Sequence, residues 1–335
     1  MNKKYNQTLN TNLFSPNIEI GSQRDGYGKG VLEAGNLDKN VVVLCCDLAE
    51  STRSEFFKNE YPERFIEVGV AEQNMAGIGA GLAAEGFIPF CSSYAVFNPG
   101  RNWDQIRVSV CYNNWNVKII GAHAGISVGP DGATHQALED IAITRVLPNM
   151  VVLAPCDEIE TKKAVMEAAK INSPVYIRFG RIKSPIFTTE ETPFAIGKAQ
   201  VFREGSDATI ISCGYLMYEA LKAAEELFKN KIDVEVINCP SIKPLDKKTI
   251  ISSLNKTKCL VTVEEHQVAG GMGSAILEML AQEDNYSFAI KMMGMQDKFG
   301  ESGDPYELLK KYGLTSQDIV NAVMDLLNKK GLKNE

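Results

Sequence analysis

The chain has 335 residues, of which 44% are hydrophobic and 23% are charged, and its formal net charge is −7 at pH 7. This length and apolar content predict a large buried core and about two domains of roughly 100–200 residues each. The acidic balance excludes a broad nucleic-acid-binding face, and no run approaches the ~20 apolar residues that cross a bilayer, whereas a phosphorylated small substrate would need only a few local cations.

The first half of the chain alternates short apolar runs with helical patterns. Residues 1–23 are polar and Asn-rich, lack the apolar core of a signal peptide, and are interpreted as an N-terminal arm. From residue 24, the pattern predicts strands at 41–47, 65–70, 88–94, 117–123, 151–155 and 175–178, and helices at 27–35, 72–84, 102–110 and 158–170. Because these strands are apolar throughout, we expect a parallel, doubly wound α/β domain over residues 24–181.

A second α/β domain is predicted for residues 199–335, after a Pro- and Thr-rich linker at 182–198. Its predicted strands are 208–213, 234–238, 260–264 and 289–293, and its helices lie near 218–230, after the glycine-rich 270–273, and at 316–329. The fold class is therefore α/β, with two doubly wound domains and mostly parallel sheets.

The cysteines indicate a reducing compartment. None forms a Cys-x-x-Cys pair, and most lie inside apolar runs, as their positions show: Cys45, Cys46, Cys91, Cys111, Cys156, Cys213, Cys239 and Cys259. We expect buried free thiols in a cytoplasmic protein.

Ionisable residues stand beside glycines at several predicted strand ends. Asp47 ends the first strand, Glu72 follows the second, and His123 ends the strand at 117–123. Ligands of open parallel sheets bind beyond these ends. The loop after His123 also carries Asp131 and His135, and two of the three histidines there could donate to sugar hydroxyls or shuttle protons.

Other candidate residues are ambiguous when taken singly. Glu72 could simply complement a helix dipole, or it could be a desolvated carboxyl with a raised pKa. Aromatic residues in the tract 89–97 could be core or a platform for a flat heterocycle. Arg24, Arg178 and Arg181 could clamp a phosphate or lie on the surface.

Two glycine-rich stretches are weak candidates for ligand loops. Gly26, Gly28 and Gly30 alternate, but no strand precedes them as a dinucleotide site requires. Residues 270–273 precede a predicted helix, where close packing is favoured over phosphate binding.

Several sequence blocks together resemble a known family. Residues 65–75, FIEVGVAEQNM, resemble the signature of the transketolase pyrimidine-binding domain. PFCSSYA at 89–95, DQIR at 104–107 and the run 123–140 resemble the same domain, in the same order and with similar spacing. The resemblance extends from about residue 24 to the C-terminus, and the second domain resembles the transketolase C-terminal domain.

The resemblance implies a thiamine diphosphate site. Glu72 matches the glutamate that hydrogen-bonds the aminopyrimidine ring and so helps to activate the thiazolium carbon. Tyr94 and Phe97 match the aromatic residues that stack on the pyrimidine, with Tyr94 replacing a usual phenylalanine, and Asp47 matches an aspartate near the cofactor.

The resemblance also implies a sugar phosphate site. His123, Asp131 and His135 match residues that contact ketose hydroxyls, and the two histidines join Glu72 as expected catalytic residues. Positions that hold the substrate phosphate are matched by Arg24, Ser51 and Arg181, with Arg178 as a weaker candidate. The implied reaction is transfer of a two-carbon ketol unit between ketose and aldose phosphates.

One part of the family pattern is missing from this sequence. The Gly-Asp-Gly motif that holds the diphosphate and its divalent metal, Mg or Ca, belongs to an N-terminal domain, and no stretch here fits it. The prediction is therefore an N-terminal transketolase subunit as partner, a heterotetramer of two of each chain, and no metal ligand in this chain.

Three alternatives stay open at this point. The chain could be the beta subunit of a 2-oxoacid dehydrogenase-type decarboxylase, although such an enzyme needs no sugar-hydroxyl ligands. It could be a transketolase for an unusual sugar, or a non-catalytic regulatory subunit. His266 is expected to be structural or interfacial, with Glu264 and Glu265 favouring its charged form.

Overall fold

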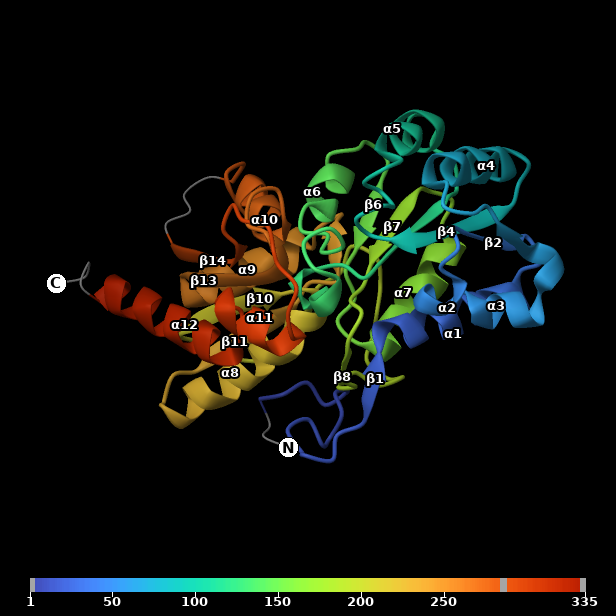
Figure 1. Cartoon of the computed structure of the whole chain (residues 1–335). Helices are drawn as coiled ribbons and strands as arrows, with labels where there is room; N and C mark the ends of the chain where they lie inside the picture. The colour runs from blue at the N-terminus through green and yellow to red at the C-terminus, as the bar shows by residue number, and fades with distance from the viewer. Residues whose placement is uncertain (1–3, 284–287, 332–335) are drawn as a thin grey trace.

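The computed structural model describes residues 4–283 and 288–331 and contains, within them, two large β-sheets with helices on both faces (Figure 1). The first sheet has the order β12-β6-β7-β5-β4-β2-β3. Its strands are β2 (Val41–Cys45), β3 (Phe65–Glu67), β4 (Ile88–Tyr94), β5 (Lys118–Ala122), β6 (Val151–Leu153), β7 (Val175–Arg178) and β12 (Ser241–Lys243). All pairs are parallel except β12 with β6, so the predicted parallel sheet is confirmed.

The helices of the first half follow the predicted alternation. They are α1 (Gln23–Leu37), α2 (Ala49–Thr52), α3 (Glu55–Glu60), α4 (Glu72–Ala84), α5 (Trp103–Gln105), α6 (Asp140–Arg145) and α7 (Glu158–Lys170). The predicted helix at 102–110 is instead the short α5 continued by a π-helix, Ile106–Tyr112.

The glycines of α1 allow close packing against α7. A Cβ on Gly26 would lie 2.2 Å from the Glu158 carbonyl oxygen, and one on Gly30 would lie 3.0 Å from that of Lys162. Because helix backbones approach this closely only without a side chain between them, these glycines serve packing. The expectation that no strand precedes them is wrong, since β1 (Ile20–Ser22) ends directly before α1, but β1 pairs antiparallel with β8 (Lys183–Pro185) outside the parallel sheet.

The second sheet has the order β14-β13-β10-β11-β9, parallel except for β9. Its strands are β9 (Gln200–Arg203), β10 (Ala208–Ser212), β11 (Val234–Asn238), β13 (Cys259–Gln267) and β14 (Ala289–Met295). Its helices are α8 (Met217–Lys229), α9 (Lys247–Thr257), α10 (Met272–Leu280), α11 (Pro305–Lys311) and α12 (Ser316–Gly331). The predicted α/β fold class is thus confirmed for both halves.

The glycine-rich turn before α10 holds a carboxylate of the protein itself. Glu264 accepts from the backbone N–H groups of Met272 at 2.6 Å and Gly273 at 2.9 Å. Burial raises the pKa of Glu264 to about 7. The phosphate-binding alternative for this turn is therefore wrong, because Glu264 already occupies the anion position at the helix N-terminus.

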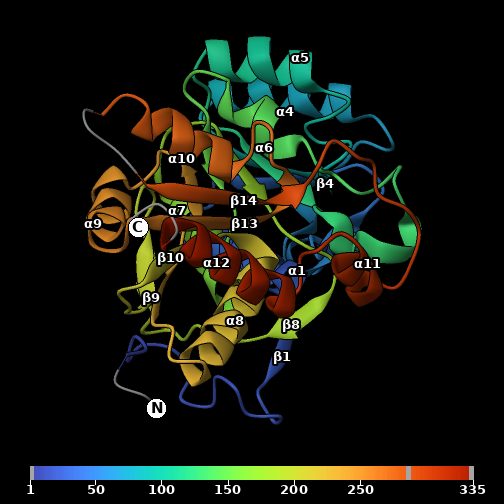
Figure 2. The same cartoon turned by 90° about the vertical axis from the view of Figure 1, so that its left-hand side faces the viewer.

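The two halves of the chain are interleaved. Strand β12 lies beyond the predicted linker yet completes the first sheet. The N-terminal arm runs beside the second half (Figure 2), where Tyr5, Leu9 and Leu13 join its core, while β1 (Ile20–Ser22) pairs with β8 (Lys183–Pro185). The boundaries at residues 24, 182 and 199 stay predictions.

His266 lies where β13 meets the first half. It is fully buried, and its Nε2 accepts from the backbone N–H of Ala142 at 3.3 Å. Burial lowers its pKa, with the Arg178 charge acting in the same direction. The structural interpretation of His266 fits this contact. The expectation that Glu264 and Glu265 favour its charged form is not met, because desolvation outweighs the opposing charge of Asp140.

All eight cysteines lie in the described part, and each is free and buried, as predicted. Among the described helices, none has the length and apolar character needed to cross a bilayer.

Candidate active site

Aromatic and imidazole rings gather at the carboxyl end of β4 and β5. Tyr94 ends β4 and pairs in register with Ala122, the residue before His123. The ring centroids of Tyr94 and His123 are 4.0 Å apart, and those of Phe97 and His135 are 5.4 Å apart. Tyr94 and Phe97 are themselves stacked at 6.1 Å. The sheet therefore brings together the four rings that the sequence singled out.

Glu72 is the first residue of α4 and its side chain is only 2% exposed. Its Oε1 accepts from Ser93 Oγ at 2.9 Å, and its Oε2 accepts from Arg101 Nη1 at 3.1 Å. Asn102 Nδ2 donates to the Glu72 backbone carbonyl at 3.1 Å. Both carboxylate oxygens are thus fixed, and the side chain is more than a dipole-complementing residue.

Arg101 connects Glu72 to the aromatic pair. Its guanidinium carbon lies 3.8 Å from the centre of the Phe97 ring, a cation–π contact, while its Nη1 bonds Glu72. The sequence interpretation missed both Ser93 and Arg101. The pair Ser92–Ser93 at the end of a mainly apolar strand was the available signal for Ser93, and Arg101 had none beyond its place between Phe97 and the DQIR block.

His123 is a buried, neutral imidazole. It is 2% exposed, has a positive φ of 58°, and its Nδ1 has no hydrogen-bond partner within the described residues. Burial, aided by the charges of Arg24 and Arg181, lowers its pKa to about 3. A neutral ring with a free nitrogen suits hydrogen bonding to a ligand better than proton shuttling near pH 7.

Three arginines form a cationic group around this ring. Arg24 Nη1 donates to the Ser51 carbonyl at 3.0 Å, and Arg181 Nη1 donates to the Val128 carbonyl at 3.1 Å. The pKa of Arg24 is lowered by burial and by the charges of Arg53 and Arg181. Arg53 is itself paired with Asp25, 2.9 Å from its Nε, so the anionic ligand is favoured mainly by Arg24 and Arg181. Arg53 was missed, although it follows Ser51 by two residues.

Not every predicted residue joins this cluster. Asp47 and Asp131 are exposed, and neither makes a recorded side-chain contact with the four rings in the described part of the chain. Arg178 is buried in an ion pair with Asp140, 2.8 Å from its Nε, and donates to the Glu265 carbonyl at 3.1 Å. The weaker proposal of Arg178 as a phosphate ligand is therefore wrong, because its charge is paired with Asp140 inside the first half and its Nη2 is bonded to the second half.

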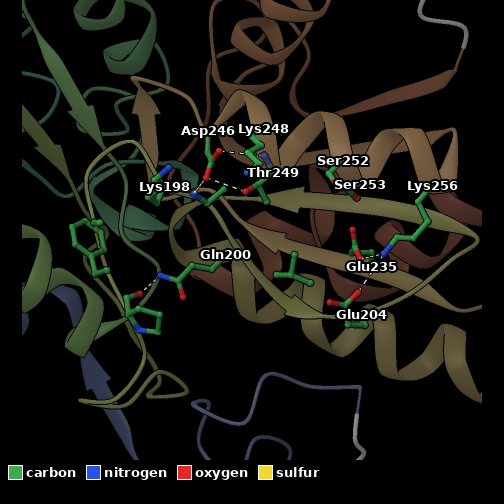
Figure 3. A pocket seen from close by; sticks show the side chains of 15 residues that line it. Lys198, Gln200, Glu204, Glu235, Asp246, Lys248, Thr249, Ser252, Ser253 and Lys256 are labelled. Atoms are coloured by element: carbon green, nitrogen blue, oxygen red, sulfur yellow. Dashed lines mark hydrogen bonds and ion pairs between the residues drawn. The ribbon is translucent and has the colours of Figure 1, made fainter.

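A separate cavity of about 780 Å³ lies beside α9 and β9, away from these rings (Figure 3). Asp246 caps α9 there by accepting from the Thr249 N–H, and Lys256 pairs with Glu204 and Glu235. The cavity is lined by none of the four rings and not by Glu72, so it is not the candidate site. No group of three or more His, Cys, Asp or Glu side chains that could hold a metal occurs among the described residues.

The fold and the cluster define a class: an α/β protein with a carboxylate, an aromatic pair and cations at the carboxyl edge of a parallel sheet. Family models match both halves, "Transketolase, pyrimidine binding domain" over residues 22–185 and "Transketolase, C-terminal domain" over residues 197–319. The chain belongs to the transketolase family, and its resemblance to the C-terminal section of a split transketolase is confirmed.

Similar chains of the same length are separate subunits or sections. A chain of Methanocaldococcus jannaschii assigned as a transketolase C-terminal section is 44% identical over 91% of this chain and 96% of its own length. The 6-deoxy-6-sulfo-D-fructose transketolase subunit SqwH of a Clostridium species is 38% identical over 96% of this chain and 99% of its own.

Solved structures agree with these relationships. A split gene transketolase solved as an inactive beta4 tetramer superposes with a TM-score of 0.85 at 44% identity, covering 92% of this chain and 98% of that one. The chain spans about half the length of single-chain relatives, for example 51% of rat transketolase at 38% identity over 94% of this chain.

Proposed function

We propose that this chain is the C-terminal subunit of a thiamine-diphosphate-dependent transketolase that transfers a two-carbon ketol unit between ketose and aldose phosphates. The observation that carries the proposal is the convergence of the buried Glu72 carboxylate, the Tyr94–Phe97 pair and the His123–His135 pair at one sheet edge.

The site fits the aminopyrimidine of thiamine diphosphate. A buried carboxylate beside two stacked aromatic rings suits a flat, nitrogen-bearing heterocycle, and the free Nδ1 of His123 faces no protein partner within the described residues. When bound, the cofactor supplies the carbanion chemistry of its thiazolium ring. Glu72 would hold a proton at the pyrimidine nitrogen, Tyr94 and Phe97 would orient the ring, and Asp47 would lie near the cofactor.

The same edge can hold a sugar phosphate. The imidazoles of His123 and His135, with Asp131 on the same loop, would hydrogen-bond the substrate hydroxyls. Arg24 and Arg181, with Ser51, would hold the phosphate, while Arg53 beside Arg24 is paired with Asp25.

The sugar itself is a separate question, because relatives differ in their substrates. One relative of matching length is a 6-deoxy-6-sulfo-D-fructose transketolase subunit. Another, from Phocaeicola vulgatus, is one of the subunits of an apulose-4-phosphate transketolase and is 34% identical to this chain. A panel of phosphorylated and sulfonated sugars therefore belongs in any assay.

A partner chain would complete the enzyme. Single-chain relatives are about twice as long, and the similar split-gene structure is an inactive tetramer of beta chains alone. We expect an N-terminal transketolase subunit that carries the diphosphate and divalent metal site, in a heterotetramer of two of each chain, in the cytoplasm.

The test is co-expression with the partner and assay with xylulose 5-phosphate and ribose 5-phosphate. Ketol transfer by the pair, and not by this chain alone, is expected. Glu72→Gln should reduce kcat by about 10²–10⁴-fold, as loss of a proton-transfer group does. Glu85→Gln, at the exposed end of the same helix, is the control. Decarboxylation of a 2-oxoacid without ketol transfer would favour the decarboxylase alternative, and no calorimetric binding of thiamine diphosphate would favour a regulatory subunit.

A further inference from the structure

The loop that carries Asp131 and His135 is closed at its base by the first half of the chain. Ala124 and Ala137 form a β-bridge, and the Gly125 N–H donates to the Ala137 carbonyl at 2.9 Å. Between these points the loop contains a 3-10 segment, Ile126–Asp131, and ends with His135 facing Tyr94 and Phe97. The contacts at the base of the loop do not by themselves determine where His135 lies.

Strand β13 of the C-terminal domain supports one side of the loop. Glu265 is 5% exposed, and its Oε2 accepts from the Ser127 backbone N–H at 2.8 Å. A Cβ on Gly125, whose φ is +89°, would lie 2.4 Å from that oxygen. The carboxylate thus touches the loop backbone directly, and glycine is required for this approach.

The segment before α11 supports the other side. Ser302 Oγ lies 2.4 Å from where a Cβ on Gly132 would be, and Pro305 Cγ lies 2.8 Å from the same point on Gly129. Gln136 Nε2 donates to the Glu301 carbonyl at 2.9 Å and to the Ile126 carbonyl at 3.2 Å. Figure 1 shows α11 beside this loop, far from it in sequence.

We propose that the C-terminal domain positions the substrate loop, and that Gln136 is the positioning residue that joins them. This inference rests on the proposed function, because Asp131 and His135 matter only if they contact a sugar. Gln136 is 3% exposed and adjacent to His135. Its amide nitrogen donates both to Ile126 at the start of the loop and to Glu301 of the C-terminal domain. Without that amide, the His135 ring loses its fixed place against Phe97.

The test uses the complex of this chain with its co-expressed partner. Gln136→Met keeps the side-chain length and removes both hydrogen bonds. We expect KM for the ketose phosphate to rise about tenfold, kcat to stay within about twofold, and thiamine diphosphate affinity to be unchanged, since Glu72 and the aromatic pair are untouched. Gln267→Met is the matched control, because its amide donates at 2.8 Å to the Lys298 carbonyl inside the C-terminal domain.

Hydrogen exchange gives a readout that does not depend on activity. Amides of residues 126–136 should exchange faster in Gln136→Met than in Gln267→Met, while those of β4 stay protected. If the wild-type complex showed no ketol transfer, the proposed function would fail. Faster hydrogen exchange in Gln136→Met would still show that Gln136 holds the loop against the C-terminal domain. If the variant does not fold, Gln136→Asn, one methylene shorter, replaces it. Unchanged exchange and KM, or an equal loss of kcat, substrate affinity and cofactor affinity, would overturn the inference.

Discussion

Replacing Arg101 by methionine tests how Glu72 is held. The change removes the Nη1 contact at 3.1 Å to Glu72 Oε2 and the cation–π contact at 3.8 Å with Phe97. Breaking a buried ion pair costs about 3–5 kcal/mol, because the remaining charge is left unpaired. Arg101 is 47% exposed, so water can reach Glu72 from that side after the change. We therefore expect a smaller loss of about 1–2 kcal/mol in the free energy of unfolding.

The same loss should appear in catalysis, since a Glu72 carboxylate held only by Ser93 is less well oriented. A barrier increase of about 1.4 kcal/mol corresponds to about a tenfold lower kcat. Urea denaturation and steady-state kinetics of the reconstituted complex measure both quantities. Arg107→Met is the control, because Arg107 is exposed and has no recorded partner in the described residues. Tighter binding of thiamine diphosphate in Arg101→Met would refute the reasoning, because Arg101 would then compete with the cofactor for Glu72.

Three further predictions concern charge and packing. Because the pKa of His123 is about 3 in the folded chain, the unfolded chain binds more protons below about pH 6.5, and stability falls as pH decreases. Between pH 7.5 and 5.0, the free energy of unfolding measured with urea should fall by about 2 kcal/mol more in the wild type than in His123→Asn. An equal pH dependence in both proteins would contradict this. Gly26→Ala should destabilise by about 1–3 kcal/mol through its contact with the Glu158 carbonyl, whereas Gly77→Ala, with open space around it, should stabilise by about 0.5–1 kcal/mol. If the unfolding midpoints of Gly26→Ala and Gly77→Ala shifted in the same direction, close packing of α1 against α7 would not explain the need for glycine at position 26. Arg24→Met should raise KM for a phosphorylated ketose about tenfold or more and leave an unphosphorylated donor unaffected, and equal effects on both donors would remove Arg24 from the phosphate site.

The sequence predicted the parts of the molecule that depend on local pattern. The six strands of the first sheet are short, mainly apolar runs and α7 has apolar residues at helical spacing, so these elements could be placed without the structure. Strand β12 has only three residues and is defined by its partner β6, and no local signal marks it. For the same reason, the prediction of Arg178 as a phosphate ligand failed: its partner Asp140 is near only in the folded chain.

Burial decided the remaining differences between expectation and structure. The two glutamates beside His266 in sequence were expected to favour its charged form, but His266 is fully buried, and Glu264 turns to the N-terminus of α10. A neighbour in sequence stabilises a charge only when its carboxylate faces that charge in space. Proximity in sequence therefore overestimates the electrostatic effect of neighbouring carboxylates on a histidine. The contact between Tyr94 and His123 is predictable, because the carboxyl ends of adjacent parallel strands lie at the same edge of a sheet.

The two parts of the candidate site depend on different halves of the chain. Glu72 is held by Ser93 and Arg101, both within the first half, so the cofactor part needs no contribution from β13 or α11. The loop of His135 is held from the second half by Glu265 and Glu301. A change at the C-terminal domain should therefore alter sugar recognition before it alters cofactor binding.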